Sequence, residues 1–567
     1  MFKRAHTAGE NLPEAPLRPA KARVSPSCGP VAWVLLAVAV VGCASEPHPT
    51  TTQSAAAGTS GAGNATGSAG GGALGSSGSS AGGSDGHTAG SANPGAGQSG
   101  TSPSAGAPSG NGGSSSSGGE TGVAGAPGVA TVPELVTSAA NAYWNKAGKV
   151  TVLTSGAADL KVDPSTKFQR WDGFGGCFNE MGWDALSVVS SEIPRAMKLL
   201  FDATDGANFT YGRLPLGASD YSTSWYTLDD TAGDYAMDKF SIERDKQMLI
   251  PFIKAALQTK PGLHLWASPW VVPAWMMDGS SNMKSDAQTL GAHALYMARF
   301  VEEYAKEGLK IEAIQPQNEP GYARVHWTQA LLIDFMKTYL GPTFAQRNLS
   351  AEIWCGTMSK DPDDTNIAKA TANDAAAMKY VKGFGVQWNL QGVVSTLAAK
   401  APVMQTEHRC GNYTFDSPYW DKGRYDANKA QNDHLYGEES WQLIRDWIVS
   451  GVNSYSAWNM VLDSVGKSLD NWPQNALLVV DRSAKTLTAT AAYYAFRHYS
   501  QYIAPGATRI GVSGSKDALA FANPDGSIVT EIYNGGGASK QTTLGVGSAV
   551  YQFDVPAHGW ATLRVTP

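Results

Sequence analysis

Between residues 166 and 504, short apolar segments of strand character alternate with longer segments of helical periodicity, and this alternation constrains the fold more than any other feature. Strands that alternate with crossover helices form a parallel sheet, because a parallel connection needs a dozen or more residues. Amphipathic segments long enough for such helices lie at residues 241–260, 292–307 and 328–340. The expected strands are residues 168–178, 207–217, 263–270, 311–319, 350–358, 384–389, 402–408 and 452–461. Eight repeats predict a closed (β/α)8 barrel, with an open doubly wound sheet as the alternative.

The segments on either side of this region have a different texture. Residues 505–567 contain short strand patterns separated by Gly-rich turns, at 518–522, 528–533 and 561–565. Residues 142–154 have similar strand character, so we expect residues 131–165 to add N-terminal strands to the same structure. The sequence therefore predicts a small all-β sandwich built from both ends, with the barrel inserted between its two parts.

The first 43 residues have the pattern of an export signal. A long basic region precedes an apolar run at residues 31–41, which is too short to span a bilayer. The run ends in Val40-Val41-Gly42-Cys43, which is similar to a bacterial lipobox, so Cys43 is the expected lipidation site. A buried helix is the alternative, but the low-complexity residues that follow could not cover it. We expect a secreted or cell-surface lipoprotein of a bacterium, attached to the membrane by lipid.

Residues 44–130 are dominated by Gly, Ser, Ala and Thr. This composition has too little apolar surface to offset the entropy of ordering, so we expect a disordered linker. A flexible chain of roughly 80 residues would hold the folded part on the order of 50 Å from its anchor.

Charge and composition narrow the class of ligand. The 43 basic and 49 acidic residues give a net charge of −6 and form no basic stripe, so we expect no nucleic-acid partner. The 17 Trp and 21 Tyr residues offer flat rings suited to stacking on sugars, although large proteins also bury many aromatic residues. We expect the protein to be a monomer.

Cysteine and histidine spacing gives no metal pattern. If Cys43 carries lipid and Cys28 is cleaved away, then Cys177, Cys355 and Cys410 remain, and at most one internal disulfide is possible. The ten His residues include no HxH or HExxH pattern. We expect neither a metal nor a cofactor.

Two glutamates follow expected barrel strands. The fourth strand ends in Gln317-Asn318-Glu319-Pro320 and the seventh in Thr406-Glu407-His408. The carboxyl ends of barrel strands form the active face, so both carboxyl groups are expected there. Glycosidic bond cleavage uses one carboxylic acid to protonate the leaving oxygen and one carboxylate on the opposite side of the anomeric carbon. Across the mouth the two could lie about 5–5.5 Å apart, a spacing that predicts retention of configuration.

Further sequence blocks accompany these glutamates: Gly173-Phe174-Gly175-Gly176, Arg213 to Asp220, Ala267-Ser268-Pro269-Trp270, Pro273-Ala274-Trp275, Gln317-Asn318-Glu319-Pro320, Glu407 and Ala457-Trp458-Asn459. Together they resemble glycoside hydrolase family 30, which includes glucosylceramidases, β-1,6-glucanases and some xylanases. They preserve the family's order over residues 140 to 567.

The resemblance implies a role for each matching residue. Glu319 matches the general acid/base and Glu407 the nucleophile, while Asn318 matches the residue that binds the substrate 2-hydroxyl. Arg213 matches the residue that orients the nucleophile, and the remaining substrate-binding positions are Asp220, Trp270, Trp388, Trp458 and Asn471.

One block departs from the family pattern. Where glucosylceramidase-like members have His-Trp-Tyr after the sixth strand, this chain has Gln387-Trp388-Asn389. The change makes a ceramide aglycone doubtful. The run Gly173 to Gly176 lacks the spacing of a phosphate-binding loop, and we expect it to form a tight turn after the first barrel strand.

The leading hypothesis is a retaining β-glycoside hydrolase acting on a β-glucan or β-glucoside. Xylan hydrolysis is the alternative within the same family, although no basic cluster for a uronic acid branch lies near Trp458 to Gln474. A noncatalytic carbohydrate-binding surface lipoprotein is the alternative from another class.

Overall fold

The computed structural model describes residues 132–154, 156–321, 324–410, 432–471 and 473–567. The predicted signal peptide, the lipidation site Cys43 and the predicted linker lie outside the described residues. Among the described helices, none combines the length and the apolar character needed to cross a bilayer.

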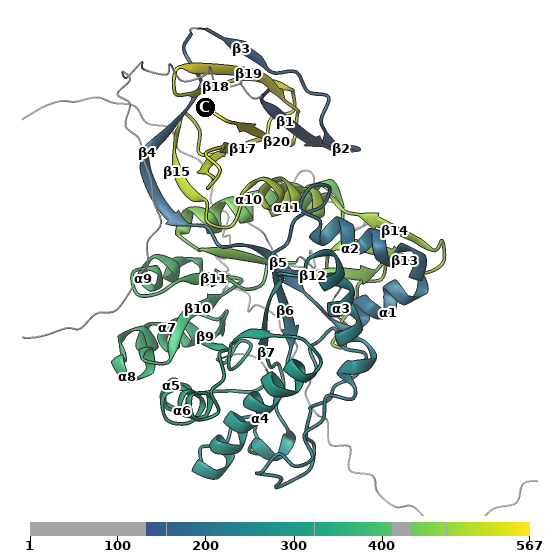
Figure 1. Cartoon of the computed structure of the whole chain (residues 1–567), viewed down its shortest axis with the longest axis vertical. Coiled ribbons are helices and arrows are strands. Elements are labelled where there is room, and N and C mark those ends of the chain that lie inside the picture. The colour runs from purple at the N-terminus through teal and green to yellow at the C-terminus, as the bar shows by residue number, and fades with distance from the viewer. Residues whose placement is uncertain (1–131, 155, 322–323, 411–431, 472) are drawn as a thin grey trace, which may run out of the picture. The chain divides into compact units, whose positions relative to one another are not determined.

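Eight parallel strands form a closed barrel (Figure 1). The ring closes where β11 pairs with β12, placing Met404 beside Ser454, and where β12 pairs with β5, placing Ser454 beside Gly173. The strands are β5 (Gly173–Cys177), β6 (Tyr211–Pro215), β7 (His264–Ser268), β8 (Ile311–Ile314), β9 (Glu352–Met358), β10 (Val381–Val386), β11 (Val403–Gln405) and β12 (Ser454–Asp463). All eight expected strands are present, and the predicted fold class is confirmed.

Helices lie around the outside of the barrel, and all except α11, which follows β14, connect consecutive barrel strands (Figure 1). They are α1 (Glu180–Val188), α2 (Ile193–Phe201), α3 (Leu249–Thr259), α4 (Ala287–Lys306), α5 (Gln329–Asp334), α6 (Gly341–Gln346), α7 (Asp363–Asn373), α8 (Ala375–Met378), α9 (Val394–Ala398), α10 (His434–Ser450) and α11 (Ala491–Tyr502).

Two of these helices begin at residues other than those the periodicity predicts. Helix α3 begins at Leu249 rather than residue 241, and Pro251 stands in its first turn, where a missing backbone N–H costs nothing. Helix α4 begins at Ala287 rather than residue 292, because the Asp286 carboxylate caps it by accepting the Thr289 N–H at 2.9 Å.

A hairpin that the sequence did not predict follows the last barrel strand. It consists of β13 (Ala476–Asp481) and β14 (Thr486–Ala489), and β13 pairs in parallel with the distal half of β12. The first half of β12 pairs with β5 and closes the barrel. Because β12 continues to Asp463, its second half can pair with β13.

A second sheet contains strands from both ends of the described chain. Its strands are β1 (Glu134–Ala139), β2 (Ala142–Asn145), β3 (Thr151–Leu153), β4 (Leu160–Arg170), β15 (Thr508–Ser513), β16 (Ala518–Ala522), β17 (Ile528–Asn534), β18 (Lys540–Val546), β19 (Ala549–Val555) and β20 (Gly559–Val565). The expected N-terminal contribution is therefore present. It ends at Arg170 rather than at residue 165, because β4 continues to pair with β15 as far as Thr508.

The sheet packs on the barrel through α10 and α11 (Figure 1). Trp441 of α10 and Trp560 of β20 are both fully buried there. Apolar burial of this extent joins the two parts through a shared hydrophobic core.

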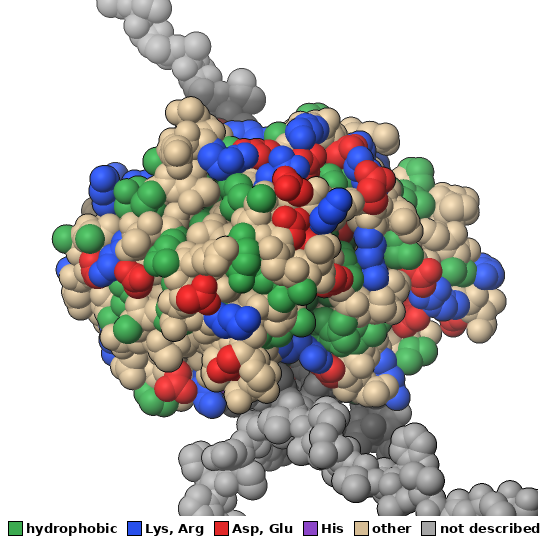
Figure 2. Space-filling view, turned by 90° about the horizontal axis from the view of Figure 1, so that it is seen from below, with side chains coloured by type: hydrophobic (Ala, Val, Ile, Leu, Met, Phe, Trp, Pro, Cys, Tyr) green, Lys and Arg blue, Asp and Glu red, His purple; other side chains and the backbone are tan. Residues whose placement is uncertain are grey.

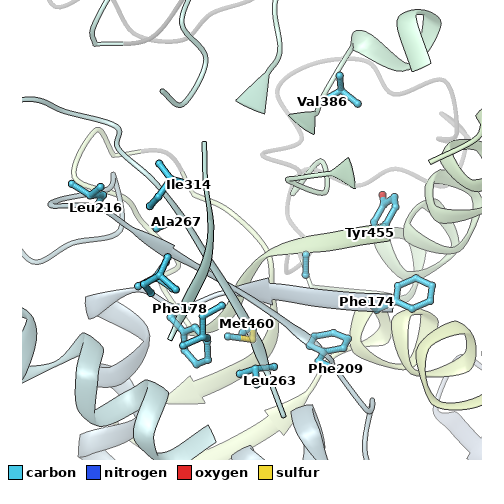
Figure 3. Close-up of a cluster of buried hydrophobic side chains, with 14 of the residues drawn as sticks. Phe174, Phe178, Phe209, Leu216, Leu263, Ala267, Ile314, Val386, Tyr455 and Met460 are labelled. Carbon is cyan, nitrogen blue, oxygen red and sulfur yellow. The ribbon is translucent and has the colours of Figure 1, made fainter. Parts of the chain in front are cut away.

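Phe174 of β5 and Met460 of β12 belong to one cluster of buried hydrophobic side chains (Figure 3). Close approach by neighbouring residues accounts for the glycines of β5. A Cβ atom at Gly175 would lie 2.2 Å from the backbone oxygen of Tyr211, and one at Gly176 would lie 2.4 Å from the Met460 side chain. The prediction of a turn after the first strand was wrong. Gly175 and Gly176 lie within β5, where residues of neighbouring strands approach too closely to leave room for a side chain.

On the face opposite the sandwich, acidic and basic side chains are interspersed (Figure 2). Because the two signs of charge alternate, this part of the surface has no large region of purely positive or purely negative electrostatic potential.

Candidate active site

Both predicted glutamates lie just beyond the carboxyl ends of barrel strands. Glu319 follows β8, and its N–H donates to the Thr357 carbonyl at 2.9 Å; Glu407 follows β11. The φ of Glu319 is +51°, a left-handed conformation that is uncommon for a residue with a side chain. Such local strain is often found at functional sites, where the surrounding structure holds it in place.

Arg213 of β6 connects three residues of the site and is fully buried. Its Nη1 donates to Glu407 Oε2 at 2.6 Å, and its Nη2 donates to Asn318 Oδ1 at 2.7 Å. The same guanidinium donates to Ser268 Oγ at 3.0 Å. A planar group with fixed donors is well suited to holding two side chains at a set angle.

The second oxygen of Glu407 is also bound. The Trp388 indole donates from Nε1 to Glu407 Oε1 at 2.8 Å. Both oxygens of Glu407 therefore accept hydrogen bonds, one of them from a cation, and these bonds fix the plane of the carboxyl group.

Two hydrogen bonds to its oxygen orient the side-chain amide of Asn318. Its Oδ1 accepts hydrogen bonds from Arg213 and, at 2.7 Å, from the hydroxyl of Thr357. Because the oxygen is fully used, the Nδ2 group is the part of this amide available to a ligand.

The electrostatic environment of Glu319 favours its protonated form. Burial and the negative charge of Glu407 raise the pKa of Glu319 from 4.5 to about 8, and Asp364 adds to the rise. The Gln387 side chain, which donates to Glu319 Oε1 at 3.1 Å, acts in the opposite direction. The two glutamates therefore differ in environment: burial and a neighbouring negative charge favour the protonated form of Glu319, whereas Glu407 is paired with Arg213.

Asp220 follows β6 and has a buried carboxyl oxygen, Oδ1, to which no described residue donates a hydrogen bond. Burial, followed by the charge of Glu407, raises the pKa of Asp220 to about 7. A buried acceptor that lacks a donor is expected to gain stability when a ligand hydroxyl reaches it.

Two indoles form a wall beside these acids. The rings of Trp270 and Trp458 are stacked with centroids 5.2 Å apart, and the Arg213 guanidinium lies 4.2 Å from the Trp270 centroid. The Trp458 indole donates to Gln474 Oε1 at 2.9 Å. Both rings belong to an apolar cluster that Trp388 covers in part.

Asn471 is separated from this group. It is exposed in the loop between β12 and β13, where its N–H donates to the Ser468 carbonyl at 2.9 Å. Among the described residues, no contact joins its side chain to the other predicted site residues. The loop itself reaches the site, because the Leu469 N–H donates to the Asp220 carbonyl at 2.7 Å.

A three-part contact holds this loop to two others. Arg324, which follows β8, pairs with Asp470 at 2.7 Å, and its guanidinium lies 3.7 Å from the Trp225 ring centroid. The loops after β6, β8 and β12 therefore meet at one side chain, close to Asp220.

Several supporting residues were missed from the sequence: Gln387, Thr357, Ser268, Gln474 and Arg324. Gln387 directly precedes Trp388, so its place at a strand end was a usable signal. The others act through contacts between distant segments, which a single sequence does not reveal.

Other polar residues near the site are satisfied or shielded. His408 contacts Tyr455 Oη at 2.6 Å and Ser440 Oγ at 3.1 Å. Cys177, Cys355 and Cys410 are buried free thiols, so the internal disulfide left open above is not formed among them. Within the described ranges, no group of three or more potential metal ligands occurs.

Comparison with known proteins agrees with this geometry. The family model for the glycosyl hydrolase family 30 TIM-barrel domain matches residues 171–503, and the model for that family's β-sandwich domain matches residues 506–563.

Individual proteins are similar over most of their length. Putative glucosylceramidase 1 of Caenorhabditis elegans is 28% identical over 451 residues, which cover 72% of this chain and 83% of that protein. Endo-1,6-β-D-glucanase neg1 of Aspergillus fumigatus is 24% identical over 413 residues, covering 66% and 80%. The crystal structure of SrfJ from Salmonella typhimurium has a TM-score of 0.68 at 23% identity, covering 77% of this chain and 99% of that one. The resemblance predicted from the sequence blocks is confirmed.

Proposed function

Because this chain belongs to glycosyl hydrolase family 30 and is a retaining O-glycosyl hydrolase, we propose that Glu407 is its nucleophile, that Glu319 is its general acid/base and that its substrates are β-linked glucosyl compounds.

The observation that carries the two roles is the difference in environment between the carboxyl groups. Glu407 forms an ion pair with Arg213 and accepts a hydrogen bond from Trp388, so its two oxygens are held in place for attack. Burial and the neighbouring charge raise the pKa of Glu319 to about 8, which keeps a proton ready for the leaving group.

The reaction then follows two steps. In the first, an oxygen of Glu407 forms a bond to the anomeric carbon while the glycosidic bond breaks and Glu319 gives its proton to the departing oxygen. Once Glu407 is esterified, its negative charge is lost, so the pKa of Glu319 falls and Glu319 can act as a base. In the second step, Glu319 takes a proton from the water that displaces Glu407, and the free sugar keeps its original configuration.

The glycone side offers groups that match an equatorial, hydroxyl-rich ring. Asp220 presents an acceptor without a donor among the described residues, and Asn318 presents an amide donor. Trp270 and Trp458 provide a flat wall. A sugar with several ring hydroxyls satisfies these polar groups while its apolar face covers the rings.

The aglycone side favours a glycan over ceramide. Gln387-Trp388-Asn389 replaces the His-Trp-Tyr block of glucosylceramidase-like members, so the loop that meets the leaving group differs from theirs. A relative that carries the name endo-1,6-β-D-glucanase supports a β-glucan as the natural substrate.

We also propose that the protein is exported and attached to a membrane through lipid at Cys43. The sequence Val40-Val41-Gly42-Cys43 and the preceding apolar run support this proposal. Cys43→Ala should move the enzyme from the detergent phase to the aqueous phase in a partition assay. Wild-type protein that partitions into the aqueous phase would contradict the anchor.

A substrate panel tests the activity. Purified protein should release sugar from aryl β-glucosides and β-1,6-glucan, and NMR should show the β-anomer as the first product. Glu407→Ala should abolish turnover and retain sugar binding. Release of sugar from glucuronoxylan alone would overturn the gluco assignment, and a first-formed α-anomer would overturn retention.

A further inference from the structure

Loops from opposite sides of the barrel mouth meet at Arg324. The strand before Arg324 is β8 and the strand before Asp470 is β12, and these two strands lie opposite each other in the closed ring. The Arg324 guanidinium donates to the Asp470 carboxylate at 2.7 Å and lies 3.7 Å from the ring centroid of Trp225, in the loop after β6. Strand β6 stands midway between β8 and β12. These three side chains, here called the clamp, therefore link the loops along the side of the mouth that β5, β6 and β7 form.

Two hydrogen bonds hold the loop after β12 against the loop after β6. The Leu469 N–H donates to the Asp220 carbonyl at 2.7 Å, and the Tyr221 hydroxyl donates to the Gly466 carbonyl at 2.8 Å. Asp470 directly follows Leu469, so its carboxylate is presented to the clamp from a fixed backbone.

Two backbone hydrogen bonds likewise hold the loop after β8 against the loop after β7. The His326 N–H donates to the Ser281 carbonyl, and the Met283 N–H donates to the His326 carbonyl, each at 3.0 Å. Arg324 belongs to the same loop as His326, and it joins this pair of loops to the first pair. Because both pairs are already fixed, little conformational entropy is lost when the clamp forms.

The clamp lies on the solvent side of Asp220, the acid proposed to bind the glycone. One carboxyl oxygen of Asp220 is buried, whereas the Arg324 side chain is 41% exposed. Asp470 lies near enough to Asp220 for its negative charge to add to the rise in the pKa of Asp220. A second sugar attached to the glycone beside this carboxyl would therefore meet the clamp before it met solvent.

We propose that the clamp closes the glycone end of the site, so that the enzyme removes single glucosyl units from the non-reducing end of its substrate. The proposal rests on the proposed β-glucosidase activity and on the glycone role of Asp220. It makes Arg324, Asp470 and Trp225 determinants of specificity, which take no part in bond cleavage.

An enzyme that cleaves inside a glycan needs room for another sugar beyond the glycone. To make that room here, Arg324 would have to leave both Asp470 and Trp225. Each of these contacts is weak by itself at a partly exposed position. A sugar that enters must break both at once, and the loops that carry them are held by their own hydrogen bonds. The clamp therefore selects against substrates that extend past the glycone.

Two aryl substrates test this closure. 4-Nitrophenyl β-glucoside carries one sugar, and 4-nitrophenyl β-gentiobioside carries a second glucose that is β-1,6-linked to the first. Direct release of nitrophenol from the gentiobioside needs room for both sugars on the glycone side. We expect the wild type to release glucose first and nitrophenol after a lag, with direct release at least about 50-fold slower than from the glucoside. Gentiotetraose reduced at its reducing end should likewise give glucose and the reduced trisaccharide as first products.

Opening the clamp should change the two aryl substrates in opposite directions. Arg324→Ala is expected to raise kcat/KM for direct release from the gentiobioside about tenfold, while kcat/KM for the glucoside falls about three- to tenfold because Asp220 is held less firmly. Asp470→Asn, which keeps the shape and removes the charge, should change both values in the same directions by smaller factors. A general loss of stability would raise neither value.

Arg347→Ala is the matched control. Arg347 is a comparably exposed arginine, and it pairs with Glu302 of α4 at 2.7 Å on the outside of the barrel. Its replacement should leave both kcat/KM values within about twofold of the wild type.

The remaining outcomes each decide the proposal. Nitrophenol released from the gentiobioside without a lag by the wild type, or gentiobiose among the first products of reduced gentiotetraose, would overturn the closure. Unchanged kcat/KM values in Arg324→Ala would show that the clamp does not determine it. If a wild type that cleaves the glucoside leaves the gentiobioside intact, the second sugar is rejected as the closure requires, and the β-1,6 linkage of the proposed substrate is wrong. Failure of the wild type to cleave the glucoside would instead count against the proposed function.

Discussion

Arg213 holds Glu407 at 2.6 Å and Asn318 at 2.7 Å with the two ends of one guanidinium, and the arginine is fully buried. The proposed nucleophile and the amide beside the proposed acid are thus fixed to a common rigid group. Because the stacked indoles of Trp270 and Trp458 also lie beside this cation, the polar centre and the aromatic wall of the site share one support.

Removing this support should affect activity and folding together. Arg213→Met is expected to lower kcat/KM by about 100-fold or more, as for loss of a preorganised charged donor. It should also lower the free energy of unfolding by about 3–5 kcal/mol, since a buried carboxyl loses its partner. Steady-state kinetics and urea unfolding measure the two effects. Arg347→Met, which breaks a partly exposed pair with Glu302, is the control and should change either quantity little. Near-wild-type kinetics for Arg213→Met would contradict the proposed orientation of Glu407.

The pKa of Glu319 predicts the alkaline limit of activity. Its pKa is raised to about 8, and the acid works only while protonated, so kcat/KM for a phenyl β-glucoside should hold through neutral pH and fall above about pH 8. The corresponding kcat/KM for a 2,4-dinitrophenyl glucoside should lack this alkaline limb. If kcat/KM for the phenyl β-glucoside already fell as the pH rose above about 5, the environment of Glu319 would not raise its pKa.

A buried polar chain joins the sandwich to α11. The hydroxyl of Ser138 lies 2.8 Å from His498 Nε2, His498 Nδ1 lies 2.7 Å from Thr562 Oγ1, and Thr562 donates to Glu531 Oε2 at 2.7 Å. All four side chains are almost fully buried, so the chain is inaccessible to substrate despite its Ser-His-Glu composition.

Glu531 should make stability depend on pH. Burial raises the pKa of Glu531 from 4.5 to about 8, so the folded state binds more protons than the unfolded state between these values. The free energy of unfolding should therefore decrease as pH rises from about 4.5 to 8. Glu531→Gln removes this dependence and should stabilise the protein at pH 8 by about 1–3 kcal/mol, with little gain at pH 4.5. Urea unfolding of both proteins at the two pH values checks the sign. Equal destabilisation by the substitution at both pH values would show that Glu531 is ionised in the folded protein.

The contact of Arg324 with Asp470 and Trp225 should influence substrate binding more than stability. Its side chains are partly exposed, so Arg324→Ala should lower the free energy of unfolding by less than about 1 kcal/mol. The loop carrying Leu469, which binds the Asp220 carbonyl, would lose its tie to the loop after β8. We expect KM for a β-glucoside to rise about three- to tenfold with a smaller change in kcat. An unchanged KM would show that the remaining bonds suffice to hold Asp220.

The sequence was informative wherever a local pattern determines structure. The eight barrel strands could be predicted because each is a short apolar run followed by polar residues at the carboxyl end, and the positions of Glu319 and Glu407 follow from the same rule. The added strands β13 and β14 were not predicted, because β13 pairs with an extension of β12 that has no distinct local signal, and β14 pairs only with β13 in the described chain.

Contacts between distant segments account for most of what was missed. Gly175 and Gly176 of β5 leave room for Tyr211 and Met460, which lie 35 or more residues away in sequence. The local sequence around these glycines therefore did not indicate that Tyr211 and Met460 lie against them. Gln387 and Thr406 are likewise brought together by the pairing of β10 with β11. A single sequence shows neither relationship, since both depend on which side chains face each other across the barrel.

The most direct test of the central claim is covalent trapping of the intermediate. The enzyme is treated with a 2-deoxy-2-fluoro-β-glucosyl fluoride, which slows both steps, and its mass and proteolytic peptides are then measured. We predict a gain of one fluoroglucosyl unit located on Glu407, with no labelling of Glu407→Ala. A label on any other residue, or turnover by Glu407→Ala, would contradict the account.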